Sequence, residues 1–338
     1  MGAATRERLR AGHRASADVS RMPQRVAVVG AGSWGTAVAA LVAANTDVTL
    51  WARDPELAGR VERDHENPHY LPGIALPNRL HASGDLTGVC ADADVVVLGV
   101  PSHGLRNVLS EASPAIAPDV PVVSLAKGVE QGTGLRMTGV VADVLRDHRV
   151  DRIGVLTGPN LAREVAEGQP AASVVAMVDA EAAAQLQALF MTTTFRVYTN
   201  PDVIGCEIAG ALKNVIAIAA GIAAGLGYGD NTKAALITRG LAGMGDLVAT
   251  CTSLKSRNRS VGVELGRGRS LADIVYEMNM VAEGVKSTSA VLELAAHHNV
   301  DMPIAAMVGA VLYDDRRPAD LVPTLMLREA KSELHGIR

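Results

Sequence analysis

The feature that most constrains the fold is a glycine-rich turn near the N-terminus, GAGSWG at residues 30–35. It directly follows the β-type run RVAVV and precedes the helix-type segment TAVAALVAAN, after which comes a second β-type run, DVTLW. A strand, a glycine turn and a helix in this order are typical of a dinucleotide-binding unit, because the glycines let the backbone approach a pyrophosphate at the helix N-terminus. We therefore expect Gly30, Gly32 and Gly35 to form a cofactor site. A glycine turn that merely joins packed elements is the alternative.

The residue after the second β-type run indicates which nucleotide the turn would hold. A site for NAD usually carries Asp or Glu about twenty residues beyond the glycines, where the carboxylate binds the ribose hydroxyls. This chain has Arg53 at that place, followed by Asp54. Because a guanidinium suits a 2′-phosphate, we expect NADP(H) to be accepted as well as NAD(H). An arginine that is simply solvated at the surface is the alternative.

Further β-type runs recur through the first half of the chain and are apolar almost throughout. Strands of this composition are buried on both faces, which is typical of a mostly parallel sheet with helices on both sides. We therefore predict an α/β, doubly wound domain of the Rossmann type. The runs are DVVVLGV (94–100), VPVVSLA (120–126), IGVLTG (153–158) and ASVVAM (172–177).

Polar residues and glycines follow several of these runs. Ligands in such folds bind beyond the carboxyl ends of the strands. Lys127 comes directly after one run, and Gly158 and Asn160 come at the end of another. We expect Lys127 to point into the cleft, while a lysine in a solvated loop is the alternative.

After Asn200 the β-type runs stop and helix-type segments follow. Residues 202–227 predict a long helix that is apolar almost all round and therefore central, and its glycines suggest close packing against another helix or a ligand. We expect a disordered extension over residues 1–24, a dinucleotide-binding domain over 25–200 and an all-α substrate domain over 201–338, with the substrate in the cleft between the two domains. The other helix-type segments are NTKAALITRGL (231–241), SLADIVYEM (270–278) and STSAVLELAAHH (287–298).

Lys213 lies inside the long apolar helix, next to Asn214. Only six of the 32 basic residues are lysines, and a desolvated lysine, unlike arginine, can release its proton near neutral pH. A structural lysine would reach the surface or pair with an acid. Our hypothesis is that Lys213 exchanges a proton with a carbonyl oxygen during hydride transfer. Asn214 would either donate to the same ligand or pack within the helix.

A polar stretch late in the chain could bind an anion. SLKSRNRS, residues 253–260, places Lys255, Arg257 and Arg259 among hydroxyl groups and Asn258. We predict a loop here, in which an arginine fork, serine and asparagine would surround a phosphate dianion. A run of charges is also typical of a solvated face, so both interpretations stay open.

Composition excludes several classes of partner. The net charge of the 338 residues is -4, so no general attraction to nucleic acid or acidic membranes follows. The polar N-terminus has no apolar signal core, and we expect no uninterrupted apolar segment long enough to span a membrane. Three widely spaced cysteines, without a CxxC pair or a zinc pattern, fit a reducing compartment. We expect a cytoplasmic protein with no metal, no nucleic-acid partner and no membrane insertion.

The order of the motifs resembles one known family. GAGSWGTA, WARDP, VPSH, LAKG, TGPNLAREVA, GALKNVIAI, ALITRGL, GMGDLVATCT, SRNR and VAEG follow one another along the chain. On these motifs the chain is similar to the bacterial glycerol-3-phosphate dehydrogenases that use NAD(P). The pair of GALKNVIAI and SRNR is highly specific for that family.

The resemblance implies a fold, a reaction and a set of site residues. It implies a helical second domain of the 6-phosphogluconate dehydrogenase type, a homodimer, and reversible hydride transfer between NAD(P)H and dihydroxyacetone phosphate, giving sn-glycerol 3-phosphate for phospholipid synthesis. Lys213 would accept the proton in oxidation and donate it in reduction. The implied cofactor contacts are Ser33, Trp34, Arg53, Lys127, Ala162, Arg257, Val281 and Glu283. The implied substrate contacts are Lys127, Gly158, Asn160, Lys213, Asp246, Ser256, Arg257 and Asn258.

One departure from the family leaves a second hypothesis open. Between ALITRGLA and GMGDL the family carries several more helical turns, whereas here Ala242 runs directly into Gly243. Asp246 must then reach the cleft over a shorter path, and a misplacement of about 1 Å can cost about a hundredfold in rate. The alternative is therefore a catalytically impaired paralogue that still binds NADP(H). A third reading is an enzyme of the β-hydroxyacid or 6-phosphogluconate group, which SRNR fits less well.

Overall fold

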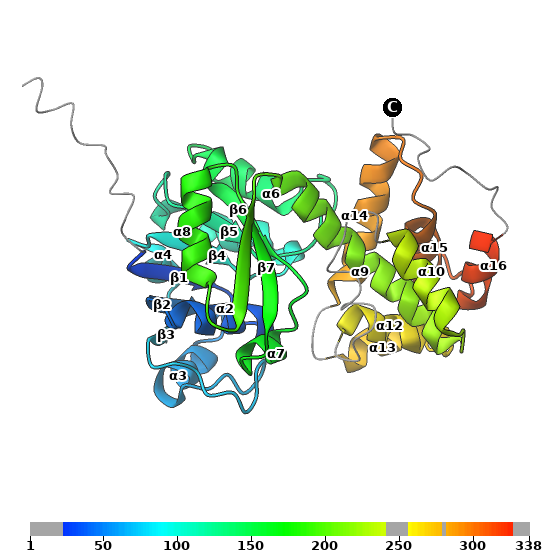
Figure 1. Ribbon diagram of the computed structural model, residues 1–338, viewed down its shortest axis with the longest axis horizontal. Helices are drawn as coiled ribbons and strands as arrows, with labels where there is room; N and C mark the ends of the chain where they lie inside the picture. Colours follow the sequence, from blue (N-terminus) through cyan, green and yellow to red (C-terminus); the bar gives the residue numbers. More distant parts are fainter. Residues whose placement is uncertain (1–22, 241–255, 279–281, 327–338) are drawn as a thin grey trace, which may run out of the picture.

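The computed structural model describes residues 23–240, 256–278 and 282–326. Eight strands form one sheet in the order β3-β2-β1-β4-β5-β6-β7-β8 (Figure 1). Neighbouring strands are parallel, except that β7 runs antiparallel to β6. The strands are β1 Arg25–Val29, β2 Asp47–Trp51, β3 Leu80–Ser83, β4 Val95–Leu98, β5 Val122–Ser124, β6 Ile153–Thr157, β7 Ala171–Ala176 and β8 Phe195–Asn200.

Helices cover both faces of this sheet, as predicted. In β4, Val95 and Val97 belong to one apolar core, while Val96 and Leu98 belong to the other. Side chains of α2, α3 and α8 complete the first core, and those of α4, α5 and α6 complete the second. The helices are α2 Ser33–Ala43, α3 Pro55–Asp64, α4 Leu86–Cys90, α5 Leu105–Ala112, α6 Met137–Val144, α7 Ala162–Ala166 and α8 Ala180–Phe190.

The two edge strands, β3 and β8, are not among the predicted runs. Both lie at the ends of the strand order, so one side of each makes no pairing within the sheet. In β8, Phe195 and Val197 are buried, whereas Arg196 and Tyr198 are exposed. An edge strand that is solvated on one face alternates in polarity, and a search for continuous apolar runs therefore misses it.

The second half of the described chain is helical. Figure 1 shows α9 leading from the sheet into a group of helices beside it. By its length and its mean hydropathy of 1.7, α9 meets the criterion for a membrane-spanning helix, although Glu207, Lys213 and Asn214 interrupt its apolar sequence. However, 67% of its apolar window is buried, as expected for the core helix of a folded domain. The helices are α9 Val203–Gly225, α10 Asp230–Gly240, α12 Arg257–Gly266, α13 Leu271–Glu277, α14 Glu283–His297, α15 Pro303–Tyr313 and α16 Leu321–Met326.

Glycines bring the backbones of α9 and α12 into direct contact. A Cβ atom on Gly221 would lie 2.2 Å from the carbonyl oxygen of Arg259, and one on Gly262 would lie 2.1 Å from that of Ile218. One turn farther along, Gly225 and its counterpart on α12 repeat the arrangement. The close packing that the glycines of α9 suggested is therefore made with another helix.

A buried carboxylate joins α9 to the sheet half of the molecule. Glu207 accepts hydrogen bonds from the amide of Thr138 at 2.9 Å and from its hydroxyl at 2.5 Å, and it pairs with the guanidinium of Arg136. Its side chain is 4% exposed. Because both partners lie at the start of α6, this cluster fixes the first turns of α9 against the sheet domain.

Candidate active site

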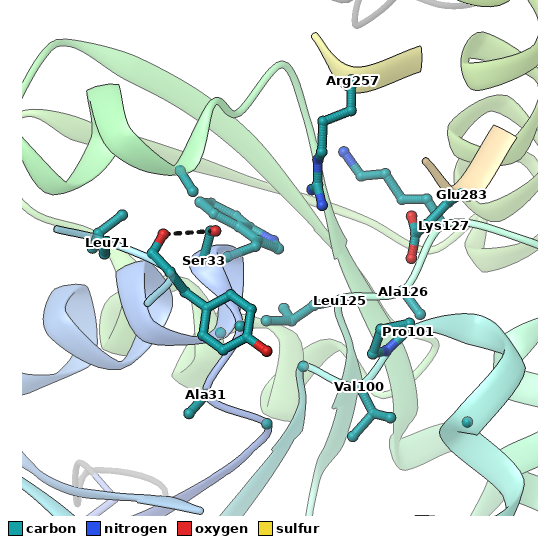
Figure 2. Close-up of a pocket in the computed structure, with 18 of the residues that line it drawn as sticks. Ala31, Ser33, Leu71, Val100, Pro101, Leu125, Ala126, Lys127, Arg257 and Glu283 are labelled. Carbon is teal, nitrogen blue, oxygen red and sulfur yellow. Dashed lines mark hydrogen bonds between the residues drawn. The ribbon is translucent and has the colours of Figure 1, made fainter. Parts of the chain in front are cut away.

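A cavity of about 870 Å³ lies at the carboxyl ends of the central strands. The glycine turn and the ends of β2, β4 and β5 line it on one side, and α9, α12 and the start of α14 line it on the other. Figure 2 shows Arg257, Lys127 and Glu283 near one another, away from Ala31 and Ser33 of the turn. The cavity therefore brings together the two halves of the chain.

The glycine turn has the geometry of an anion site. Gly30 has a φ of +118°, a conformation that favours glycine. A Cβ on Gly35 would lie 2.0 Å from the carbonyl oxygen of Gly30, so α2 can pack this closely only with glycine there. A Cβ on Gly32 would meet nothing within 4 Å, and no side chain caps the N-terminus of α2. The open space and the amides at the helix start fit the pyrophosphate of a dinucleotide.

The other predicted cofactor residues in the first half also line the cavity. The Ser33 hydroxyl donates to the carbonyl oxygen of Tyr70 at 2.8 Å, the dashed line in Figure 2. Trp34 lies against Phe195 with ring centroids 6.5 Å apart. Arg53 is exposed at the end of β2. Ala162 lies at the first turn of α7, and all four predicted residues are in the lining of the cavity.

Two lysines and an arginine surround a carboxylate at the other end of the cavity. The Lys127 ammonium donates to the carbonyl oxygen of Gly158 at 2.9 Å. Lys213 is 5% exposed, and its side chain lies in the lining together with Arg257 and Glu283. Burial raises the pKa of the Glu283 carboxyl, while the charges of the three cations and the backbone amide of Lys127 act to lower it. This cluster of positive charge in a partly desolvated space suits a phosphorylated substrate.

The residues after β6 differ in their placement. Gly158 is absent from the lining that the described residues provide, and a Cβ there would lie 2.7 Å from the Ser173 hydroxyl. Gly158 thus contributes its carbonyl to Lys127 and leaves room for a neighbouring strand. The Asn160 amide donates to the same hydroxyl at 2.7 Å, but its buried side-chain oxygen has no hydrogen-bond partner among the described residues. Asn160 as a residue lines the cavity.

The prediction of a loop over residues 253–260 is wrong from Ser256 onward. The Ser256 hydroxyl accepts a hydrogen bond from the amide of Arg259 at 3.3 Å, and α12 begins at the next residue. A serine in this position stabilises a helix start by satisfying a free amide. The Asn258 oxygen accepts from the amide of Gly284 at 2.9 Å, which holds the start of α14 against α12. All three of the expected phosphate contacts, Ser256, Arg257 and Asn258, still line the cavity.

Other expectations fall on parts of the chain that the structure does not describe. Asp246 and Val281 lie outside the described residues, and so does the junction of Ala242 and Gly243. Conversely, Tyr70 and His103 line the cavity although no role was assigned to them from the sequence. His103 follows β4 and belongs to the strand ends beyond which ligands were expected to bind, whereas nothing in the sequence marks Tyr70.

Two models of protein families match the chain. The one described as the NAD-dependent glycerol-3-phosphate dehydrogenase N-terminus matches residues 25–183, and the one described as the C-terminus of the same enzyme matches residues 202–242 and 239–323. The chain belongs to this family. The family and the fold class predicted from the sequence are thereby confirmed.

Curated relatives and solved structures agree with the family assignment. The chain is 52% identical to glycerol-3-phosphate dehydrogenase (NAD(P)+) 2 of Sphingopyxis alaskensis, covering 93% of this chain and 99% of the relative. It is 49% identical to glycerol-3-phosphate dehydrogenase (NAD(P)+) of Thermobifida fusca, with the same coverage. The structure of glycerol-3-phosphate dehydrogenase from Coxiella burnetii superposes with a TM-score of 0.85 at 34% identity, covering 90% of this chain and 99% of that chain. A 3-hydroxyisobutyrate dehydrogenase of Salmonella typhimurium, at 17% identity and a TM-score of 0.51, shares the fold alone.

The family match also bears on the helical turns that this chain lacks between Ala242 and Gly243. The C-terminal family model matches in two pieces, and these meet at residues 239–242. The alignment with the Sphingopyxis relative spans 334 positions although it covers only 93% of the 338 residues here, so that relative carries residues that this chain lacks. Both observations agree with a deletion at the junction noted in the sequence.

Proposed function

We propose that this chain catalyses the reversible transfer of hydride between NAD(P)H and dihydroxyacetone phosphate, with sn-glycerol 3-phosphate as the product of reduction. The observation that carries the proposal is a single cavity with an anion site for a dinucleotide at one end and a cluster of Lys127, Lys213 and Arg257 at the other. The names of the relatives support this enzyme over the cofactor-binding paralogue and over a dehydrogenase for another acid.

Each part of the cavity would have its own task. The bound nicotinamide supplies or accepts the hydride. The α2 N-terminus and Arg53 would hold the phosphates of the cofactor, whereas Arg257 and Lys127 would bind the substrate phosphate. Lys213 would donate a proton to the C2 oxygen as the carbonyl is reduced, and its burial excludes competing water. Because the substrate phosphate is remote from the reacting carbon, its binding would serve mainly to orient that carbon.

Three further properties belong to the same proposal: the oligomeric state, the location in the cell and the domain bounds. We infer a homodimer and a cytoplasmic location, and we divide the chain into a cofactor domain over residues 25–200 and a substrate domain over 201–338. The change from a strand ending at Asn200 to a helix beginning at Val203 supports that division. Light scattering after size-exclusion chromatography tests the dimer, and a monomeric mass would refute it.

A steady-state assay tests the reaction. Purified protein should oxidise NADPH when dihydroxyacetone phosphate is added. Lys213→Ala should lower kcat by about 10²–10⁴-fold, the usual contribution of a general acid, without loss of NADPH binding. Lys233→Ala is the matched control, since Lys233 pairs with Asp230 at 2.6 Å outside the cavity lining.

Three outcomes would contradict the proposal or a part of it. Tight NADPH binding without turnover in the wild type would favour the paralogue. A Lys213→Ala enzyme with wild-type kcat would show that another group supplies the proton. Dihydroxyacetone without its phosphate should be a poor substrate, and equal rates for the two would exclude the cationic cluster as a phosphate site.

A further inference from the structure

Two cations and a histidine, from three separate elements, gather at the mouth of the cavity. Arg53 follows β2, His103 lies in the short helix η1 (Ser102–Gly104) after β4, and Lys286 lies in the first turn of α14. All three residues are exposed, and both Arg53 and His103 line the cavity. Of the three residues, only Arg53 was predicted from the sequence to bind a phosphate.

Packing around Gly128 shows that η1 and α14 converge. A Cβ on Gly128 would lie 2.9 Å from the Ser287 hydroxyl and 3.0 Å from the Ser102 hydroxyl. The Gln131 amide also donates to the carbonyl oxygen of Lys286 at 3.1 Å, which fixes the start of α14 beside the loop after β5. The sequence neighbours of the two serines, Lys286 and His103, are thereby brought to the same rim.

Charge at this rim is positive and not compensated by a carboxylate. Among the described residues, no acidic side chain forms an ion pair with Arg53, His103 or Lys286. Asp54 also lines the cavity, but its carboxylate accepts a hydrogen bond from the amide of Glu56 at 2.9 Å as the cap of α3. Partial burial, together with the charges of Lys286 and Arg53, lowers the pKa of His103, which is a further sign that the three groups are close.

A dinucleotide has one anionic group that could occupy this rim. The pyrophosphate has its own site at Gly32 and the N-terminus of α2. The ribose of the adenosine lies beyond the end of β2 in folds of this kind. A 2′-phosphate on that ribose would carry close to two negative charges and three acceptor oxygens to the rim of the cavity, which Arg53 and His103 line.

We propose that Arg53, His103 and Lys286 form one cationic bracket that selects NADP(H) over NAD(H) by its 2′-phosphate. This inference rests on the proposed function for the identity of the cofactor. Arg53 and His103 donate to the phosphate, and Lys286 adds its charge from the helical half.

Direct binding titrations test the bracket without any turnover. The affinities of NADPH and NADH are measured by calorimetry for the wild type, His103→Gln and Lys286→Gln, at low and at high salt. Lys233→Gln is the matched control, because it removes a lysine charge outside the cavity lining. We expect His103→Gln and Lys286→Gln each to weaken NADPH about three- to tenfold at low salt, as the loss of one charged hydrogen bond or ion contact would.

The result for NADH decides the interpretation. NADH affinity should change less than about twofold, which also shows that each variant is folded, and the loss for NADPH should shrink at high salt because exposed charges are screened. Equal losses for both cofactors, no loss for either, or a selective loss in only one of the two variants would overturn the three-residue bracket. The proposed function fails independently, since a protein that selects NADPH through these residues but never reduces dihydroxyacetone phosphate would keep the bracket and lose the reaction.

Discussion

The contact of α9 with α12 is the feature whose disturbance should affect both stability and catalysis. A Cβ on Gly221 would lie 2.2 Å from the carbonyl oxygen of Arg259 and 2.9 Å from the Cα of Gly262. Real Cβ atoms hardly ever come closer than 3.0 Å to such atoms, so Gly221→Ala must push the helices apart by about 0.8 Å. Neither obstacle is the end of a flexible side chain, and the backbone itself has to move.

The magnitude follows from that displacement. Overpacking of this kind costs about 1–3 kcal/mol of stability, which lowers Tm by several degrees in a protein of this size. Because α9 carries Lys213 and α12 begins with Arg257, the same shift separates the proposed proton donor from the proposed phosphate ligand. A misplacement of about 1 Å can cost about a hundredfold in rate, so we expect kcat to fall about 10- to 100-fold.

Thermal unfolding and steady-state kinetics on dihydroxyacetone phosphate check this prediction together. Gly225→Ala creates the same kind of clash, at 2.2 Å from the carbonyl oxygen of Val263, but one turn farther from Lys213. It should lose similar stability and less activity. Gly229→Ala is a neutral control, since a Cβ there meets nothing within 4 Å. Wild-type Tm and kcat in Gly221→Ala would refute the reasoning.

The remaining predictions concern the half-buried carboxylate of Glu283 and the buried carboxylate of Glu207. Because burial raises the pKa of Glu283, the folded state holds the proton more tightly than the unfolded state, and the free energy of unfolding should fall as pH rises above about 4.3, the ordinary pKa of glutamate. In urea unfolding at a series of pH values, Glu283→Gln should remove the part of this decrease in unfolding free energy that Glu283 causes. If the pH profiles of wild type and variant superimpose, the assignment to Glu283 is contradicted. Glu207→Gln should cost about 3 kcal/mol in urea unfolding, because it leaves Arg136 without its buried partner. Glu277→Gln, whose side chain is 63% exposed and pairs with Arg269, should cost less than about 1 kcal/mol, and equal costs would show that burial does not matter.

The central strands could be predicted from the sequence because their environment is uniform. Val95 to Leu98 are all buried, so composition alone identifies β4. The strands β3 and β8 face solvent on one side, and their mixed composition resembles that of a loop. The start of α12 was missed for a related reason. Its first residues, Arg257 to Arg259, are polar, and only the capping hydrogen bond of Ser256 identifies a helix start there.

The candidate site was predictable where a residue type conflicts with its surroundings. Lysine in an apolar helix and glycine in a strand–helix turn are such conflicts, and Lys213 and Gly32 do line the cavity. Residues whose positions depend on contacts between distant segments could not be found in this way. Asn258 meets Gly284 across 26 residues, and His103 approaches Lys286 only because η1 and α14 both pack on one glycine.

A lysine is tolerated in α9 because the helix has different neighbours along its length. Glu207 holds the first turns to the sheet domain, and Gly210 leaves space for the stem of Lys127, whose Cγ would lie 3.7 Å from a Cβ at that position. Lys213, less than a turn farther on, therefore faces the cavity instead of the apolar core. Two turns later Gly221 admits α12, which brings the anion-binding side chains to the same space. The packed turns of α9 are thus apolar apart from Glu207, which is paired with Arg136, and Lys213 lies in the turn that faces the cleft.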